Sequence, residues 1–391
     1  MYQTLRQNQL LRSARRSAKQ GLKFAIPKSL RAWIRAIPPA VSYQILKLSS
    51  RSPLLSSLYY AFFSPAFRRE NHGVVCGKLR YAHDLKYAQY SDFLIRRNVH
   101  RLEKGLLMRP RRDIFARDFI TETVESYKHA LRTKSSPERE SSEMQWAHDV
   151  LSQYFSIVGS EPTIDSARRT FLSLPALTSV SPAALTEREP EAGQSTHQNA
   201  AGRTPYKRDL ETPTVSYDQL LQLSQRRRSV RWYLDRPVDR SLLDKAIEVA
   251  TLSPSACNRQ PFEFRIFDDP EAIAEISAVP MGTRGFAHNF PTIIVLVGKL
   301  SAYFDERDRH VIYIDASLAA MSFMYALETL GLSSCPINWP DIEAKEAKMA
   351  ALLGLAPDER IVMLMSAGHP DPEGMVAYSQ KKTLDQLRRY R

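Results

Sequence analysis

The 391-residue sequence lacks the short motifs that identify many enzymes. No GxGxxG follows a strand pattern and no GxxxxGK[ST] occurs, so neither a Rossmann dinucleotide site nor a P-loop is indicated. HExxH and GxSxG are also absent, and the nine histidines are not spaced as metal ligands. The three cysteines, Cys76, Cys257 and Cys335, form no CxxC pair, so we expect neither a zinc site nor a redox dithiol.

Acidic residues are missing from the first 69 positions, which contain 13 lysines and arginines. The formal net charge of the whole chain is +13, so residues 70–391 are balanced in charge. The excess positive charge therefore belongs to the N-terminal segment alone. No recognisable nucleic-acid-binding module accompanies it, so we expect no nucleic-acid partner.

Long hydrophobic runs are also missing: no 18 consecutive residues are apolar, which argues against a membrane-spanning helix. Residues 54–63, between Pro53 and Pro65, carry apolar side chains at helical spacing. Three interpretations of residues 1–69 stay open. They are a peripheral anchor on an anionic membrane, an organelle transit peptide, and an arm that packs on its own protein.

The remaining pattern divides the chain into four stretches. Residues 1–75 are the basic region with an amphipathic helix, and residues 80–174 have the apolar spacing of a helical region. Residues 175–214 are rich in proline and small polar residues, which is typical of a linker. Residues 215–391 form the last domain.

The last domain alternates helix and strand patterns. Strands are predicted at residues 262–267, 292–297 and 361–365, and helices at residues 314–330 and 341–353, with a further helix after the N-cap residue Asp239. Gly331 and Gly354 stand where left-handed helix-terminating residues are needed. These elements predict an α+β domain with a sheet between helices.

Four polar clusters lie at the ends of these elements. The first is the arginine-rich run 226–231, since guanidinium groups bind phosphate oxygens in pairs. The second is the loop 253–261, which is rich in hydrogen-bonding side chains. The third follows Gly331, where Pro336 directs the next amides toward a ligand rather than a strand ladder. The fourth is residues 379–382, with two lysines. Each cluster alone is also compatible with an ordinary solvated turn.

Taken together and in this order, the clusters resemble those of the nitroreductase family of FMN-dependent oxidoreductases. The residues that carry the resemblance are the runs 227–231, 254–261, 288–291 and 315–320, the turn 330–332 with residues 335–338, and the terminal run 379–382. They cover about the last 175 residues. The resemblance implies a nitroreductase-like fold with a mixed central sheet flanked by helices, formed as a homodimer.

The resemblance also implies a role for each cluster. The FMN phosphate and ribityl chain would be bound by the arginine run and the terminal lysines, namely Arg227, Arg228, Ser229, Arg231, Lys381 and Lys382. The second cluster would contact the flavin from the partner subunit through Pro254, Ser255 and Asn258. Backbone at the third cluster would face the flavin ring at Pro336, Ile337 and Asn338. No protein acid or base is then compulsory, because the flavin carries the redox chemistry. No metal is expected.

The expected activity is ping-pong hydride transfer from NADH or NADPH through FMN to a small-molecule acceptor, in a cytoplasmic enzyme. The membrane-anchor interpretation of residues 1–69 would place this enzyme peripherally at the membrane. Two alternatives stay open. One is another flavin reaction on the same fold, such as dehalogenation, dehydrogenation of a biosynthetic intermediate or flavin breakdown. The other is a non-catalytic membrane-associated scaffold. Met321 departs from the family pattern because it stands where the helix often carries a Gln.

Residues 96–106 form a motif-like stretch that is similar to one found upstream of the domain in larger family members. His100 and Glu103 share a helix face at this spacing. They are candidates for capping the flavin pocket. The competing interpretation is an exposed charged face or docking surface.

Overall fold

The computed structural model describes residues 39–64, 66–86, 91–139, 141–175, 203–207 and 213–391. Most of the predicted linker 175–214 and of the basic N-terminal segment lies outside these residues. The chain divides into two compact units, residues 1–69 and 70–391. In the first unit, helices α3 (Pro39–Ser49) and α4 (Pro53–Phe62) are described. Helix α5 (Arg68–Lys86) begins at the boundary between the units.

Four helices form a bundle in the N-terminal part of the second unit: α6 (Asp92–Leu107), α7 (Ile120–Thr133), α9 (Ser142–Ile157) and α10 (Pro162–Leu172). The short helix α8 (Ser136–Arg139) joins α7 to α9. The bundle has its own buried core, with Leu102, Val124 and Leu151 at its centre. The helical pattern of residues 80–174 thus corresponds to helices in the described part of that range.

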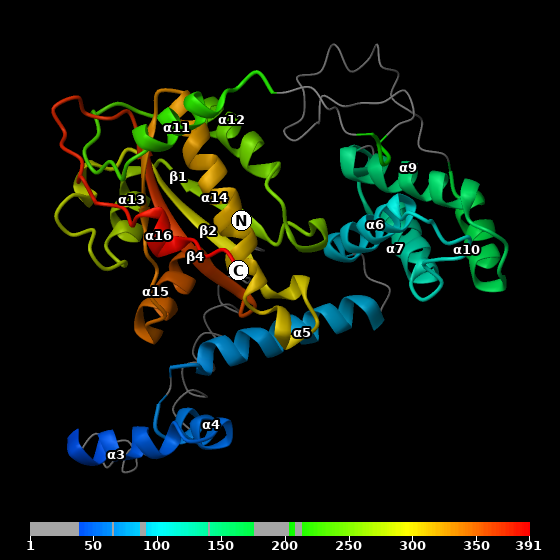
Figure 1. The fold of residues 1–391 in the computed structure, drawn as a ribbon, viewed down its shortest axis with the longest axis horizontal. Coiled ribbons are helices and arrows are strands. Elements are labelled where there is room, and N and C mark those ends of the chain that lie inside the picture. Colours follow the sequence, from blue (N-terminus) through cyan, green and yellow to red (C-terminus); the bar gives the residue numbers. More distant parts are fainter. Residues whose placement is uncertain (1–38, 65, 87–90, 140, 176–202, 208–212) are drawn as a thin grey trace, which may run out of the picture. The chain divides into compact units, whose positions relative to one another are not determined.

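The C-terminal domain contains a four-stranded sheet in the order β1-β2-β4-β3 (Figure 1). The strands are β1 (Phe262–Phe267), β2 (Ile293–Lys299), β3 (Ser333–Ile337) and β4 (Glu359–Gly368), and all their pairings are antiparallel. Parallel pairing occurs only at an isolated bridge between Ser229 and Ser334 among the described residues. The mixed character of the sheet rests on that bridge.

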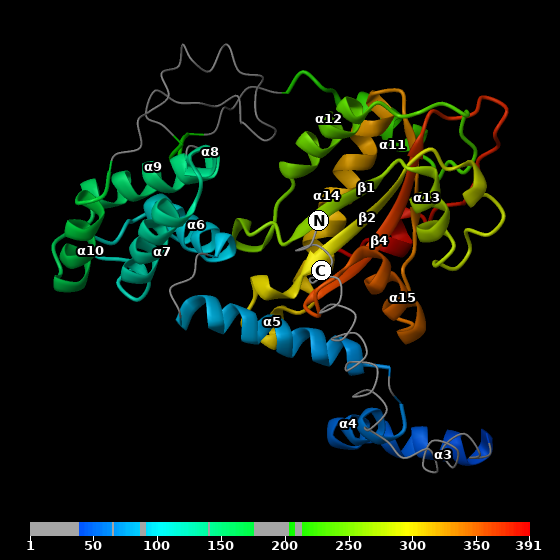
Figure 2. The ribbon, with the colours of Figure 1, turned by 180° about the vertical axis from the view of Figure 1, so that it is seen from behind.

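Helices cover both faces of this sheet (Figures 1 and 2). Helices α12 (Arg240–Thr251) and α14 (Val311–Thr329) pack with Ile294 and Leu296 of β2. Helices α13 (Pro270–Ser277) and α15 (Glu343–Leu353) pack with Val295 and Val297 on the other face. Alternate residues of β2 point to opposite faces, so a continuous apolar run is required.

The structure confirms the two glycines that were predicted to end helices. Gly331 and Gly354 have φ values of +75° and +64°, a region that glycine enters without the strain caused by a Cβ atom. Helix α15 begins at Glu343 rather than at Asp341 as predicted. The helices α11 (Tyr217–Arg226) and α16 (Leu384–Leu387) complete the domain.

One helix among the described residues, Glu306–Thr329, is long and apolar enough by length and composition to cross a membrane. It contains α14, whose Ala316, Ala320 and Phe323 are buried against the sheet. Its apolar composition is therefore explained by its position in the domain core.

Candidate flavin site

The arginine-rich cluster and the cluster after Gly331 lie together at one edge of the sheet. Ser229 forms the parallel bridge to Ser334, and the Val230 amide donates to the Ser334 carbonyl at 3.1 Å. Burial raises the pKa of the neighbouring Cys335 thiol, and Arg231, the Ser229 hydroxyl and Arg227 oppose that shift. Residues that are more than 100 positions apart in the sequence are thus brought into one polar site.

The third cluster corrects one prediction. Residues 333–337 form the edge strand β3 rather than a loop, and Pro336 pairs with Met365 of β4. Proline is tolerated there because an edge strand leaves one row of its backbone groups without a strand partner. Ile337 is the last residue of the strand, and Asn338 follows it as an exposed residue.

Asn289 holds the arginine run in place. Its amide group donates to the Arg231 carbonyl at 3.0 Å and its side-chain oxygen accepts from the Tyr233 amide at 2.9 Å. The buried Tyr233 hydroxyl donates to the Val230 carbonyl at 2.8 Å. Asn289 and Tyr233 together therefore fix the backbone on both sides of Arg231.

The charges of this edge fit a phosphate-bearing flavin. Within the part of the chain that the structure describes, Arg227 and Arg228 form no ion pair with a carboxylate, and the Arg231 guanidinium lies over the Phe286 ring at 5.6 Å. The Ser334 hydroxyl is fully buried without a hydrogen-bond partner. Guanidinium groups that lack carboxylates are available to phosphate oxygens.

The second cluster lies at the opposite corner of the same sheet. The loop 253–261 leads into Phe262, which pairs through Gly298 to Arg360, whereas Ser333 pairs with Gly368. Three interstrand spacings and eight residues along β4 separate these corners by about 14 Å across the strands and about 26 Å along them. Pro254, Ser255 and Asn258 therefore do not meet the arginine run within one chain.

The loop itself has a constrained backbone. Cys257, Asn258 and Gln260 have φ values of 53°, 52° and 49°, which non-glycine residues seldom adopt. The loop surrounds the 3₁₀ turn η2 (Ala256–Asn258), whose first amide donates to Asp315 at 3.0 Å. Burial raises the pKa of Asp315, against the effects of that amide, of Tyr303 and of Arg259.

Arg96 of helix α6 is a site residue that the sequence patterns did not single out. Its Nε donates to the Asn258 carbonyl at 2.8 Å and its Nη2 donates to the Gln260 side-chain oxygen at 2.7 Å. It stands at the start of the motif-like stretch 96–106, and that stretch was the only available signal. Within the motif, His100 and Glu103 approach to 3.4 Å, and Glu103 accepts a hydrogen bond from Trp146.

The two terminal lysines stay outside this arrangement in a single chain. The C-terminal segment is anchored beside the arginine run, where the Asp371 amide donates to the Trp232 carbonyl at 3.1 Å. Beyond Gly374 the segment is exposed, and Lys381 and Lys382 are exposed with it.

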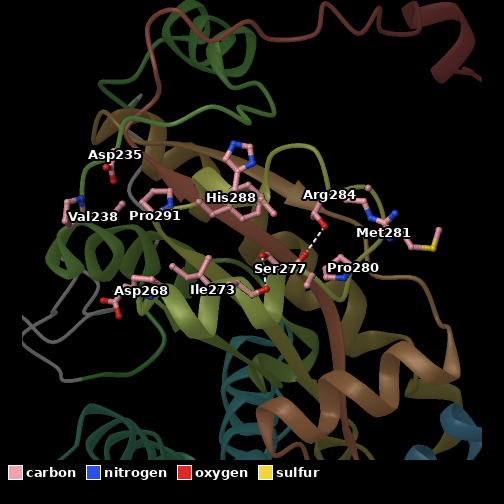
Figure 3. Close-up of a pocket in the computed structure, with 18 of the residues that line it drawn as sticks. Asp235, Val238, Asp268, Ile273, Ser277, Pro280, Met281, Arg284, His288 and Pro291 are labelled. Carbon is pink, nitrogen blue, oxygen red and sulfur yellow. Dashed lines mark hydrogen bonds between the residues drawn. The ribbon is translucent and has the colours of Figure 1, made fainter.

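A cavity of about 980 Å³ lies elsewhere in the domain (Figure 3). Figure 3 shows its wall around Asp268, Ser277, Arg284 and His288, and none of the predicted flavin residues lines it. The predicted site is not a closed cavity in one chain because its parts occupy opposite corners of the sheet.

Comparison with known proteins identifies this domain. The model of the nitroreductase family matches residues 225–283 and 278–369. A putative NADH dehydrogenase/NAD(P)H nitroreductase of Archaeoglobus fulgidus is 29% identical over 160 residues, which are 40% of this chain and 88% of that protein. Iodotyrosine deiodinase 1 of Pongo abelii is 23% identical over 200 residues, which are 43% of this chain and 67% of that protein.

Among solved structures, an FMN-dependent nitroreductase from Clostridium difficile R20291 aligns with 26% identity and a TM-score of 0.37. The alignment covers 44% of this chain and 99% of that one. The family match and the curated relatives fall on the same C-terminal region. Residues 225–369 therefore constitute an oxidoreductase domain of the nitroreductase family, preceded in this chain by a helical region.

Proposed function

We propose that this protein is a homodimeric, FMN-dependent oxidoreductase that takes hydride from NADH or NADPH and passes electrons to a small-molecule acceptor. The observation that carries the proposal is the bridge between Ser229 and Ser334, because it joins the arginine run to the beginning of β3. When bound, FMN supplies the chemistry of hydride transfer. The reaction is ping-pong, with the donor leaving before the acceptor binds.

Each chain residue has a defined task in this proposal. Arg227, Arg228 and Ser229 bind the phosphate with Arg231, and Lys381 and Lys382 add positive charge beside it. Backbone at Pro336, Ile337 and Asn338 faces the flavin ring and orients it. Because cations and amide groups stabilise negative charge that develops near them, the protein tunes the flavin without a catalytic acid or base.

The position of the second cluster supports a homodimer. Loop 253–261 can contribute to a flavin site only in another copy, since one chain holds it at the far corner of the sheet. Two exposed apolar surfaces support this arrangement. Ile314 and Leu318 form a stripe on the outer face of α14, and the C-terminal segment exposes Met375, Tyr378 and Tyr390. Exposed apolar side chains that lie together are typical of association surfaces.

The purified protein is expected to bind FMN and to lose its flavin absorbance when NADH or NADPH is added without oxygen. An absorbance titration measures both steps. A colourless protein that gains no flavin spectrum on addition of FMN contradicts the proposal. FMN binding without bleaching by either donor favours the non-catalytic scaffold.

The acceptor is tested on the reduced protein. Nitroaromatic compounds and halogenated tyrosines are the first candidates, because a putative nitroreductase and an iodotyrosine deiodinase both match this domain. Reoxidation by a halotyrosine with release of halide, without reaction of a nitroaromatic, favours the dehalogenation alternative.

We further propose that residues 1–69 attach this cytoplasmic enzyme to an anionic membrane surface. In α4, Leu54, Leu58 and Phe62 recur at every fourth position and are 69%, 44% and 62% exposed, and no described side chain of that helix is buried. The surrounding segment contains only basic charges. An apolar helix face with basic neighbours is the combination that binds peripherally to anionic lipid.

The full-length protein is expected to float with vesicles of phosphatidylserine and phosphatidylcholine, and to float less at high salt. Replacing Leu54, Leu58 and Phe62 with serine is expected to release it, while flavin binding stays unchanged. Flotation that is unaffected by these changes, or equal on vesicles without anionic lipid, argues for the transit-peptide or docking-arm interpretation.

A further inference from the structure

A second cavity, of about 670 Å³, lies in the helical bundle. It is formed by the C-terminal half of α6 and by residues 108–119, which connect α6 to α7. Three of the lining residues are basic, namely Arg101, Lys104 and Arg112, and none of the lining residues is acidic. Asp118 and Glu122 act on Arg101 from outside the lining, whereas Lys104 and Arg112 form no ion pair with a carboxylate among the described residues.

The apolar wall of this cavity is held in a fixed position. Phe115 contacts the backbone of α6 at Gly105, where any side chain would displace its ring. The Phe115 carbonyl accepts a hydrogen bond from the Tyr154 hydroxyl at 2.8 Å, and the two rings pack edge to face. The Arg101 guanidinium lies 3.7 Å from the centre of the Phe119 ring. The cavity thus offers a preformed aromatic surface beside positive charge.

The cavity belongs to the same helix that holds the proposed flavin loop. Arg96 of α6 binds Asn258 and Gln260 of that loop. Helix α6 also packs against the 3₁₀ turn η2 of that loop. Arg101, which lines the cavity, follows Arg96 by five residues on the same helix. A ligand in the cavity therefore lies beside the loop that, in the proposed function, faces flavin.

We propose that this cavity binds the adenosine diphosphate part of a nicotinamide dinucleotide, with the diphosphate at Lys104 and Arg112 and the adenine on Phe115. This inference rests on the proposed function, since the nicotinamide end of the donor must reach the flavin. A ligand that carries two adjacent negative charges and a flat ring matches Lys104, Arg112 and the aromatic wall. The cavity volume lies within the range of small-molecule sites.

Comparing two hydride donors distinguishes a specific loss of dinucleotide binding from a general effect on turnover. Reduced nicotinamide mononucleotide lacks the adenosine monophosphate part that NADH carries. The variant Lys104→Ala/Arg112→Ala is expected to raise KM for NADH roughly tenfold. The same variant is expected to raise KM for reduced nicotinamide mononucleotide much less, because that donor keeps only one of the two phosphates and has no adenosine. Both side chains are exposed, so the fold is preserved.

The matched control is Arg109→Ala/Arg111→Ala, which removes the same charge from two exposed neighbours that do not line the cavity. It is expected to behave as the unmodified protein. Equal effects of both double variants on NADH, or an equal rise in KM for both donors, overturn the proposal. A changed KM for an anionic acceptor with an unchanged KM for NADH assigns the cavity to the acceptor and also overturns it.

Calorimetric titration of the FMN-saturated protein with ADP tests the cavity without turnover. Excess FMN keeps ADP out of the flavin site. Binding that is lost in Lys104→Ala/Arg112→Ala and kept in the control supports the proposal, and no binding by the unmodified protein contradicts it. Failure of the proposed function gives a different result, because neither donor then reduces the protein whatever ADP does.

Discussion

Replacing Arg231 with alanine is expected to weaken FMN binding by about ten- to a hundredfold, since a hydrogen bond to a charged group contributes about 1.5–3 kcal/mol. The backbone at this position is held independently of the side chain by Asn289 and Tyr233. The substitution therefore removes a guanidinium from the site and leaves its scaffold in place. Quenching of flavin fluorescence in a titration measures the affinity.

Two further variants sharpen this measurement. Arg231→Lys keeps the charge but loses the planar pair of donors, so its affinity is expected to fall between those of the alanine variant and the unmodified protein. Arg132→Ala, on the exposed side of α7, is the matched control and is expected to change nothing. Unchanged affinity in Arg231→Ala removes Arg231 from the site.

The dimeric site makes this experiment more specific. If each flavin site combines Arg231 of one copy with Asn258 of another, mixing an Arg231→Ala chain with an Asn258→Ala chain creates heterodimers with one intact site. Partial recovery of FMN binding after mixing and reassembly is therefore expected. Absence of recovery, in a protein shown to exchange subunits, places both groups in the same copy.

Arg96→Ala is expected to lower FMN affinity about tenfold without touching the phosphate site. Three residues of the loop, Cys257, Asn258 and Gln260, have left-handed backbone conformations that cost about 1–3 kcal/mol each and persist only when neighbouring structure holds them. Arg96 supplies two of the hydrogen bonds that do so. Its removal allows the loop to relax before it meets flavin.

Hydrogen exchange distinguishes this positioning effect from general unfolding. In Arg96→Ala, faster amide exchange is expected in residues 254–261 and unchanged exchange in β2 and β4. Arg97→Ala is the matched control, because Arg97 donates to the Tyr81 hydroxyl rather than to the loop. Normal loop exchange together with normal FMN affinity in Arg96→Ala means that the bundle plays no part in shaping the site.

Several parts of the fold follow from local patterns. Alternating and continuous apolar runs predict β1 and β2, and the glycines after two helices predict left-handed ends that the structure contains. These features succeed because periodicity and turn chemistry act over a few residues. The β3 prediction failed because Pro336 favours a loop in an isolated segment, whereas an edge strand tolerates it.

The candidate site shows the same division. The order of the polar clusters and the confinement of the excess positive charge to the first 69 residues are properties of the sequence alone. Only the tertiary structure decided that Ser229 pairs with Ser334, that loop 253–261 occupies the opposite corner of the sheet, and that Arg96 binds this loop from 162 residues away. Contacts of such separation depend on how whole elements pack, and sequence periodicity reports only which face of an element is buried.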